Sequence, residues 1–311
     1  MKNKIIIGII ALSFIALVVI ILSSKVPKSI DITTFESAYN VVQFSDEENI
    51  EIPIFISMED SYIINKDNVI SSKIKNDQDS IAFNINRIVD TEEKALIKNK
   101  RFHKYILILN PVLKLEDDFT LEIDNAILEI NYSQGININI NIGSFSYYYY
   151  STSGNDLSIS KLKGLVNTYT DKLLVGVQIG LKSNTDDVIK ITNIKALDTN
   201  VILAKSSIVL NKDFTQGAKI DDFLGYTYDP YGDFEDRDFN IILDKEYNLF
   251  IPLKYKKDIL LNKLGFLIEY EINGVTKYFC IDDFIFFNTN LYSEKRINNL
   301  KLYTYENYWT T

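Results

Sequence analysis

The segment Phe266–Ile281 reads FLIEYEINGVTKYFCI and carries the strongest hairpin signal in the chain. Asn273-Gly274 is a two-residue turn that closes antiparallel hairpins readily, because both residues tolerate the positive φ angles that the turn requires. A seven-residue run flanks the turn on each side, which sets Ile272 opposite Val275 on the apolar face. The segment therefore predicts two paired strands with one core face and one mixed face.

A second segment, GINININIG at 135–143, alternates without exception. Its isoleucines fall on one face and its asparagines on the other, which is the pattern of a half-buried strand with a polar outer face. Outside an apolar run near the amino end, only 91–100 could hold a turn or two of helix. Further runs of strand character cover 50–56, 80–88, 105–109, 173–181 and 188–197.

These patterns favour an all-β fold, with an N-terminal transmembrane helix followed by two tandem β-sandwich-like (Ig-like) domains. Many short strands without helices are typical of sandwiches, whose domains hold about 100 residues. The polar stretch STSGND at 151–156 is typical of a linker. The expected boundaries are 1–4 for a cytoplasmic amino end, 5–22 for the anchor, 23–34 for a linker, 35–150 for the first domain, 151–156 for a second linker, 157–291 for the second domain and 292–311 for an aromatic tail.

A weak internal echo joins the two predicted domains. Ile127–Tyr132 resembles Leu267–Ile272, and the pair Ile74-Lys75 resembles Ile194-Lys195, each pair following a similar short run. Short matches also arise by chance in a chain with 48 isoleucines. The echo leaves both a true duplication and chance similarity open.

Composition excludes several classes of function. The 311 residues include 33 Lys+Arg and 42 Asp+Glu, a net charge of -9 that disfavours nucleic-acid binding, which needs a basic surface. A single cysteine excludes a disulfide framework, a Cys-rich zinc site and an iron–sulfur cluster. Twelve scattered glycines do not form a phosphate-binding loop.

The amino end predicts membrane attachment. Ile5–Leu22 is apolar and uncharged, and its helix would be about 27 Å long, close to the hydrocarbon thickness of a bilayer. Lys2 and Lys4 favour a cytoplasmic amino end, which places the bulk of the chain outside the cytoplasm. The prediction is a single-pass protein of the cell membrane; the alternative is a cleaved signal peptide and a secreted protein.

An acidic segment is the candidate metal site. Calcium prefers several carboxylate oxygens on a flexible loop, although the spacing here is not that of an EF-hand and a solvated acidic loop is the simpler interpretation. Calcium is the one cofactor that the sequence suggests. The candidate ligands are Asp229, Asp233, Glu235, Asp236 and Asp238.

Tyrosines form the candidate binding surface. In the run Tyr147–Tyr150, strand alternation puts Tyr148 and Tyr150 on one face, where exposed rings could stack on sugars or enter a protein interface. Tyr305 and Trp309 in the predicted tail invite the same hypothesis. Structural tyrosines at a domain junction are the alternative.

The sequence contains no recognisable catalytic motif. His103 lies in a basic stretch, no G-x-S-x-G surrounds a serine, and Cys280 has no histidine near it in sequence. The expected function is therefore non-catalytic binding, as an accessory subunit of a cell-envelope complex with an envelope protein partner. The alternatives are a glycan or cell-wall binding module and, less favoured, an envelope hydrolase that uses a carboxylate pair.

Overall fold

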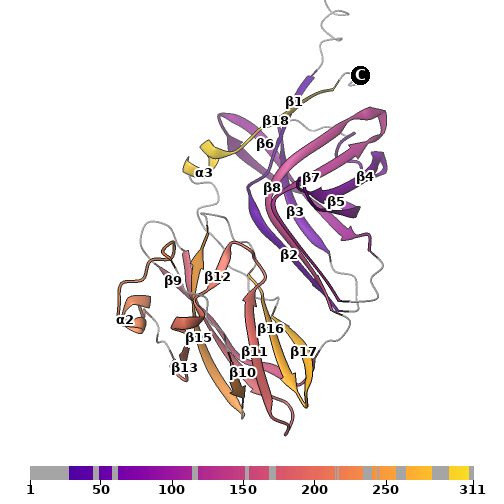
Figure 1. Ribbon diagram of the computed structural model, residues 1–311. Helices are drawn as coiled ribbons and strands as arrows, with labels where there is room; N and C mark the ends of the chain where they lie inside the picture. Colours follow the sequence, from indigo (N-terminus) through magenta and orange to yellow (C-terminus); the bar gives the residue numbers. More distant parts are fainter. Residues whose placement is uncertain are drawn as a thin grey trace, which may run out of the picture.

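The computed structural model is nearly all β, which confirms the all-β expectation. Two β units lie one above the other (Figure 1). Among the described residues, no helix is long and apolar enough to cross a membrane. The predicted anchor at 5–22 lies outside those residues. The structure describes residues 28–44, 49–57, 62–113, 118–150, 154–167, 173–213, 215, 217–233, 240–243, 245–256, 264–281 and 294–307.

The first unit is one nine-stranded sheet in the order β18-β1-β3-β6-β5-β4-β7-β8-β2. Adjacent strands in this sheet pair antiparallel, except β2 and β8, which pair in parallel. The sheet curls so that strands near its two ends approach each other: the Asn141 backbone N–H of β8 donates to the Tyr303 hydroxyl of β18 at 2.9 Å. The strands are β1 (Lys28–Thr33), β2 (Ser37–Gln43), β3 (Ile50–Ile56), β4 (Val69–Lys75), β5 (Ser80–Ile97), β6 (Lys100–Pro111), β7 (Phe119–Tyr132), β8 (Asn137–Tyr149) and β18 (Tyr303–Asn307).

The core of the first unit lies inside this curled sheet. Ile52, Leu107, Leu128 and Ile140 come from β3, β6, β7 and β8, and all are buried in one cluster. The two ends of the sheet thus face each other across the core, so the packing is sandwich-like although the hydrogen bonding is continuous. Short helices flank the strands: η1 (Lys66–Asn68), η2 (Ser133–Gly135) and α3 (Glu294–Asn299).

The second unit is a sandwich of two sheets. One sheet has the order β12-β15-β10-β9, with β13 also paired to β15, and the other has the order β14-β11-β16-β17. Val177 and Ile251 of the first sheet share a core cluster with Ile191 and Ile268 of the second. The elements are β9 (Leu157–Asn167), β10 (Leu173–Ser183), β11 (Ile189–Ala196), β12 (Val201–Leu203), η3 (Lys205–Ser207), β13 (Val209–Leu210), α2 (Ile220–Leu224), β14 (Ile241–Leu243), β15 (Glu246–Tyr255), β16 (Phe266–Ile272) and β17 (Val275–Ile281).

The predicted hairpin is confirmed residue by residue as β16 and β17. Ile272 pairs with Val275 and Phe266 with Ile281. Asn273 and Gly274 have φ angles of 51° and 78°, as a type I′ turn requires. The alternating strand is confirmed too, since the isoleucines of β8 are buried and its outer face is lined with asparagines.

Three segments differ from the expectation, and each owes its structure to a distant partner. Residues 91–97, where a helical turn was possible, belong to β5, which pairs with β6 through a bulge between Asp90 and Lys94. Strand β1 lies within the predicted linker at 23–34, and β18 lies within the predicted tail. These two strands pair with each other, and strand formation depends on such neighbours more than on local propensity.

The sequence echo coincides with equivalent strand pairing. In the first unit β4 pairs with β7, which pairs with β8; in the second, β11 pairs with β16, which pairs with β17. The registers agree, which supports duplication of a three-strand segment. The matching pairs are Lys73–Glu129, Ile74–Leu128 and Lys75–Ile127 in the first unit, and Asn193–Glu269, Ile194–Ile268 and Lys195–Leu267 in the second.

Candidate functional site

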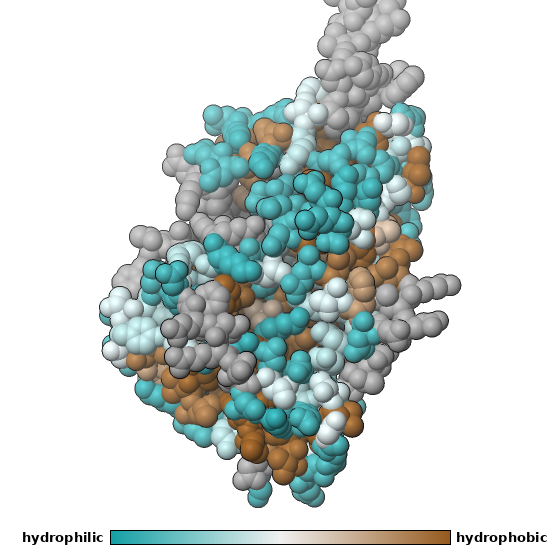
Figure 2. Space-filling view, in the orientation of Figure 1, coloured by the Kyte–Doolittle hydropathy of each residue, from teal (hydrophilic) through white to brown (hydrophobic). Residues whose placement is uncertain are grey.

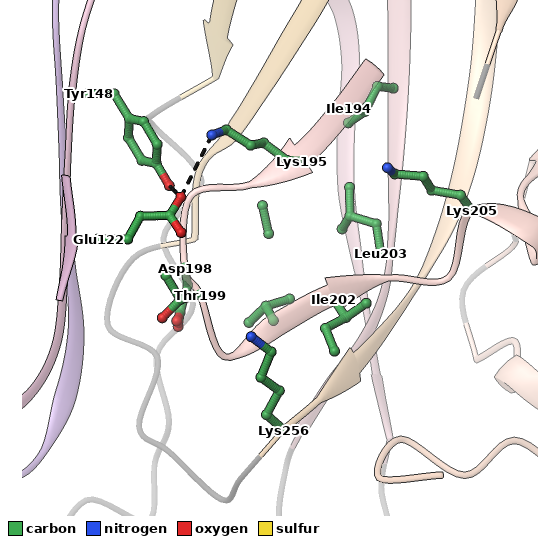
Figure 3. Close-up of a pocket in the computed structure, with 12 residues that line it drawn as sticks. Glu122, Tyr148, Ile194, Lys195, Asp198, Thr199, Ile202, Leu203, Lys205 and Lys256 are labelled. Carbon is green, nitrogen blue, oxygen red and sulfur yellow. Dashed lines mark hydrogen bonds and ion pairs between the residues drawn. The ribbon is translucent and has the colours of Figure 1, made fainter. Parts of the chain in front are cut away.

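The candidate site lies between the two units, where a tyrosine, a glutamate and a lysine meet. Tyr148, near the end of β8, is buried, and its hydroxyl donates to Oε1 of Glu122 in β7 at 2.6 Å. Lys195 of β11 crosses from the second unit, and its Nζ lies 4.2 Å from the Tyr148 ring centroid and 3.7 Å from Glu122 Oε1 (Figure 3). One cation therefore contacts both a π face and a carboxylate of the other unit.

The electrostatics of this contact keep Tyr148 neutral. Burial raises the pKa of the Tyr148 hydroxyl well above its usual range, and the hydrogen bond to Glu122 raises it further. Burial lowers the pKa of the Lys195 ammonium, against the opposing attraction of Glu122. The phenol therefore acts as a fixed hydrogen-bond donor and not as an acid or base at neutral pH.

A second aromatic contact lies beside the first. Tyr150 stacks on Tyr278 of β17, with ring centroids 4.1 Å apart and an interplanar angle of 24°. Burial raises the pKa of Tyr150 to about 12. Val42 of the first unit and Leu197 and Leu267 of the second pack in the same buried cluster.

Polar contacts complete the interface. Buried Asn200 donates from Nδ2 to Ser144 Oγ at 2.9 Å, and the Thr199 hydroxyl donates to Asp124 Oδ1 at 2.9 Å. Both donors come from the turn between β11 and β12, and both acceptors come from the first unit. Directional bonds of this kind fix the orientation of the units in addition to burying area.

An interunit cleft of about 380 Å³ opens beside these contacts. Its three lining lysines come from different parts of the second unit: Lys195 lies in β11, Lys205 lies in η3, and Lys256 directly follows β15. The remaining lining residues are Glu122, Tyr148, Ile194, Ala196, Asp198, Thr199, Val201, Ile202 and Leu203.

Hydrogen bonds hold the walls of this interunit cleft in place. Asp198 Oδ1 accepts from the Asn200 backbone N–H at 2.8 Å and from its side-chain amide at 3.1 Å. Lys205 Nζ donates to Asn193 Oδ1 at 3.0 Å. The backbone N–H of Lys256 donates to the Asn200 carbonyl at 2.9 Å.

The structure places the predicted binding tyrosines in the interface and not on the surface. Tyr148 is 1% exposed and Tyr150 is 5% exposed, so neither ring offers a face to a sugar while the units are packed together. The reason is that β8 continues past its own core into the contact with the second unit. The backbone of Tyr305 lies in β18 opposite Ile30; its side chain and all of Trp309 lie outside the described residues.

The candidate calcium ligands are described only in part. Asp229 and Asp233 are exposed, and Asp229 Oδ1 accepts from the Tyr231 backbone N–H at 2.9 Å within a turn. Glu235, Asp236 and Asp238 lie outside the described residues. In the part of the chain that the structure describes, no three His, Cys, Asp or Glu side chains come together as a metal site. Calcium binding by this segment stays a prediction.

The other singled-out side chains lie apart from the interunit cleft or at the edge of the interface. His103 lies in β6, opposite Ile56 of β3 and Lys94 of β5. Cys280 of β17 is partly buried and packs against the cluster of Tyr150 and Leu267. Sequence reasoning missed the three cleft lysines, because they form no local motif and only the fold brings them together.

Exposed apolar side chains form a further surface feature. Figure 2 shows hydrophobic residues at the surface of the lower part of the molecule, which Figure 1 identifies as the second unit. Val188, Ile242 and Val275 of this unit are each more than half exposed. Scattered exposed apolar residues are normal on soluble domains, so they do not by themselves define a site.

Comparisons with known proteins assign no family. No protein-family model matches the chain, and no curated protein matches its sequence. Among solved structures, the chain is similar to the C-terminal domain of the AgI/II polypeptide BspA of Streptococcus agalactiae, at 11% identity and a TM-score of 0.21, over 80% of this chain and 98% of that one. It is also similar to CBD12 from CALX1.2, at 8% identity and a TM-score of 0.18, over 78% and 80% of the two chains. Likenesses this weak carry no argument about fold or function.

Proposed function

We propose that the protein is a membrane-anchored, extracytoplasmic binding protein without catalytic activity, which serves as an accessory subunit of a cell-envelope complex. The observation that best supports this role is the interface of Tyr148, Tyr150 and Tyr278. It holds two β units in one arrangement, so that surfaces of both are presented together to a partner. Preorganised surfaces bind with less loss of conformational entropy than jointed ones.

The place of β1 is consistent with attachment by the predicted anchor. Strand β1 begins at Lys28, shortly after the apolar run 5–22, at the end of the first unit that lies away from the second (Figure 1). An anchor entering there would leave the second unit projecting away from the membrane. We also propose that the two units are Ig-like domains.

Protease treatment of intact cells tests the location. In intact cells we expect both units to be digested while a cytoplasmic marker protein survives. Once the cells are opened, the protein and the marker should both be digested. Protection of the whole chain in intact cells would contradict the proposal. Recovery of the undigested protein in the medium would indicate the secreted alternative.

A further inference from the structure

We propose that the tip of the β5–β6 hairpin, residues 94–101, docks on the surface of an anionic lipid membrane, with Lys94, Lys98 and Arg101 at the lipid headgroups. The inference rests on the proposed membrane anchor and adds a second contact between the first unit and the same membrane. The segment 94–104 reads KALIKNKRFHK and holds five Lys or Arg residues and no acidic residue, in a chain with a net charge of -9. Basic clusters that lie close to a membrane attract anionic lipid.

Strand pairing places the hairpin tip at the end of the first unit where the predicted anchor would enter. Ile32 of β1 pairs with Ile56 of β3, which pairs with His103 of β6. Both pairings are antiparallel, so β1 and β6 run in the same direction and begin at the same end of the sheet. Lys100 Nζ lies 2.5 Å from Asp31 Oδ2, so the start of β6 contacts β1. In Figure 1 this end of the first unit lies away from the second unit.

The short connection to the predicted anchor would keep the hairpin tip near the membrane. Only residues 23–27 separate the apolar run Ile5–Leu22 from β1, which begins at Lys28. Even a fully extended chain spans at most about 20 Å from Leu22 to Lys28. A tether of this length gives the hairpin tip a high effective concentration at the lipid surface, so that weak individual contacts are sufficient.

Three cations of the hairpin tip are positioned to meet lipid phosphate. Lys98 Nζ donates to the Leu300 backbone carbonyl at 2.7 Å, a neutral acceptor that leaves the positive charge in place. Lys94 and Arg101 are exposed, and no ion pair to either is recorded among the described residues. Each basic side chain near an anionic membrane adds to the attraction, and the contributions accumulate within a cluster.

Two further cations of the segment are already paired and are not counted toward lipid binding. Lys100 pairs with Asp31, and Lys104 Nζ lies 2.8 Å from Glu93 Oε2. These ion pairs occupy two acidic side chains as well. The three remaining cations stand against Glu92, which lies in the bulge that precedes the hairpin tip.

An exposed leucine lies among these cations. Leu96 pairs with Arg101 across the hairpin and is 65% exposed. Ile97 and Phe102 alternate onto the opposite face, where they are buried in a core cluster. Strand alternation therefore puts Lys94, Leu96 and Arg101 on the solvent face. An apolar side chain flanked by cations is suited to enter the headgroup region while the cations contact phosphate.

Fluorescence of the full-length protein in lipid nanodiscs tests the proposal. The variant Leu96→Trp/Trp309→Phe carries a single indole at the hairpin tip, because Trp309 is the one native tryptophan. The discs contain phosphatidylcholine with about one third phosphatidylglycerol, and brominated acyl chains serve as the quencher. We expect bromination to reduce the emission by about half. In discs of phosphatidylcholine alone, the quenching should be at least about threefold smaller.

Removal of charge separates electrostatic docking from mere proximity to the disc. The reporter variant with Lys94→Gln, Lys98→Gln and Arg101→Gln added should lose at least about two thirds of its quenching in the anionic discs. Salt at about 1 M should have a similar effect on the reporter variant itself, because the Debye length falls to about 3 Å.

The matched control adds Lys182→Gln, Lys219→Gln and Lys245→Gln to the reporter variant. It removes the same charge from exposed positions of the second unit and should leave the quenching unchanged. Equal quenching in the two kinds of disc, no quenching in either, or equal effects of the two triple variants would overturn the inference.

Incorporation of the chain into the discs is measured first, as co-elution with lipid in size-exclusion chromatography. Failure to incorporate would contradict the predicted anchor, and this inference with it. Incorporation without quenching of the indole would overturn this inference alone and leave the proposed anchor standing, so the two failures are distinguishable.

Discussion

Tyr150 of the first unit stacks on Tyr278 of the second, with ring centroids 4.1 Å apart. Tyr150 directly follows β8 and Tyr278 lies in β17, so this stacking contact joins the two units. Stacked rings add about 0.5–1.5 kcal/mol beyond the free energy of burying their area. Through this contact and that of Tyr148 with Lys195, the end of the tyrosine run Tyr147–Tyr150 connects the two units.

Replacing Tyr150 by Ala should destabilise the protein by about 3 kcal/mol, because a large buried ring is removed from a packed interface. Urea unfolding followed by near-UV circular dichroism would measure the loss. Tyr226→Ala is the matched control, since Tyr226 is 49% exposed, and it should change the free energy of unfolding by less than about 0.5 kcal/mol. Equal effects of the two replacements would argue against a structural role for Tyr150.

The Tyr148→Phe variant separates the hydroxyl from the ring. It keeps the cation–π contact with Lys195 and removes the 2.6 Å hydrogen bond to Glu122. We expect a loss of about 1 kcal/mol in the free energy of unfolding, because Glu122 is 44% exposed at its side chain and water can replace the phenol. A loss as large as that of Tyr148→Ala would show that the hydroxyl, and not the ring, holds the interface.

Glu129 should make the stability of the first unit depend on acid pH. The hydrogen bond from Lys75 lowers the pKa of Glu129, and burial opposes this effect. With the further hydrogen bond from Lys73, the pKa falls from 4.5 to about 2. A lowered folded-state pKa contributes stability that is present above pH ~4.5 and is lost as pH falls toward about 2. Because both lysines are partly exposed, we expect a contribution of about 2 kcal/mol.

The Glu129→Gln variant tests this expectation. Its free energy of unfolding should fall less steeply than that of the wild type between pH 5 and pH 2, in urea titrations at fixed ionic strength. Glu51→Gln, at an exposed position of β3, should follow the wild-type curve. If Glu129→Gln also follows the wild-type curve, the ion pairs with Lys73 and Lys75 do not contribute measurable stability.

The pairing of β1 with β18 should depend on Asp31. The Thr304 hydroxyl donates to Asp31 Oδ1 at 2.6 Å, and Lys100 Nζ donates to Oδ2 at 2.5 Å. Although burial raises the pKa of this carboxyl, the two hydrogen bonds outweigh it and the pKa is lowered. Thr304→Val should therefore increase the hydrogen-exchange rate of residues 28–33, measured by mass spectrometry, by about fivefold.

Thr276→Val in β17 is the control for this exchange measurement. Its side chain is exposed on another edge strand, so exchange at 28–33 should be unchanged. Unchanged exchange in Thr304→Val as well would show that the backbone pairing of β1 with β18 does not need the Asp31 contact.

Local patterns predicted those strands whose partners are near in sequence or whose alternation is strict. The β16–β17 hairpin follows from Asn273-Gly274, and β8 follows from its isoleucine period. By contrast, β1 and β18 pair across about 270 residues of chain, and no local signal encodes that contact.

The candidate site was less predictable, for a physical reason. Tyr148 and Tyr150 stood out in the sequence, but whether an alternating ring faces solvent or another unit depends on the packing of the two units. Lys195, Lys205 and Lys256 come from separate elements of a chain with 29 lysines. Only the tertiary structure distinguishes them from lysines on a solvated surface.

Chemical crosslinking of the full-length protein in its native cells, followed by mass spectrometry, tests the central claim most directly. The account predicts a stoichiometric envelope protein crosslinked to the chain through residues of the two units. Recovery of cell-wall fragments without any protein would contradict an accessory-subunit role and favour the glycan alternative. Crosslinks to cytoplasmic proteins alone would contradict the account altogether.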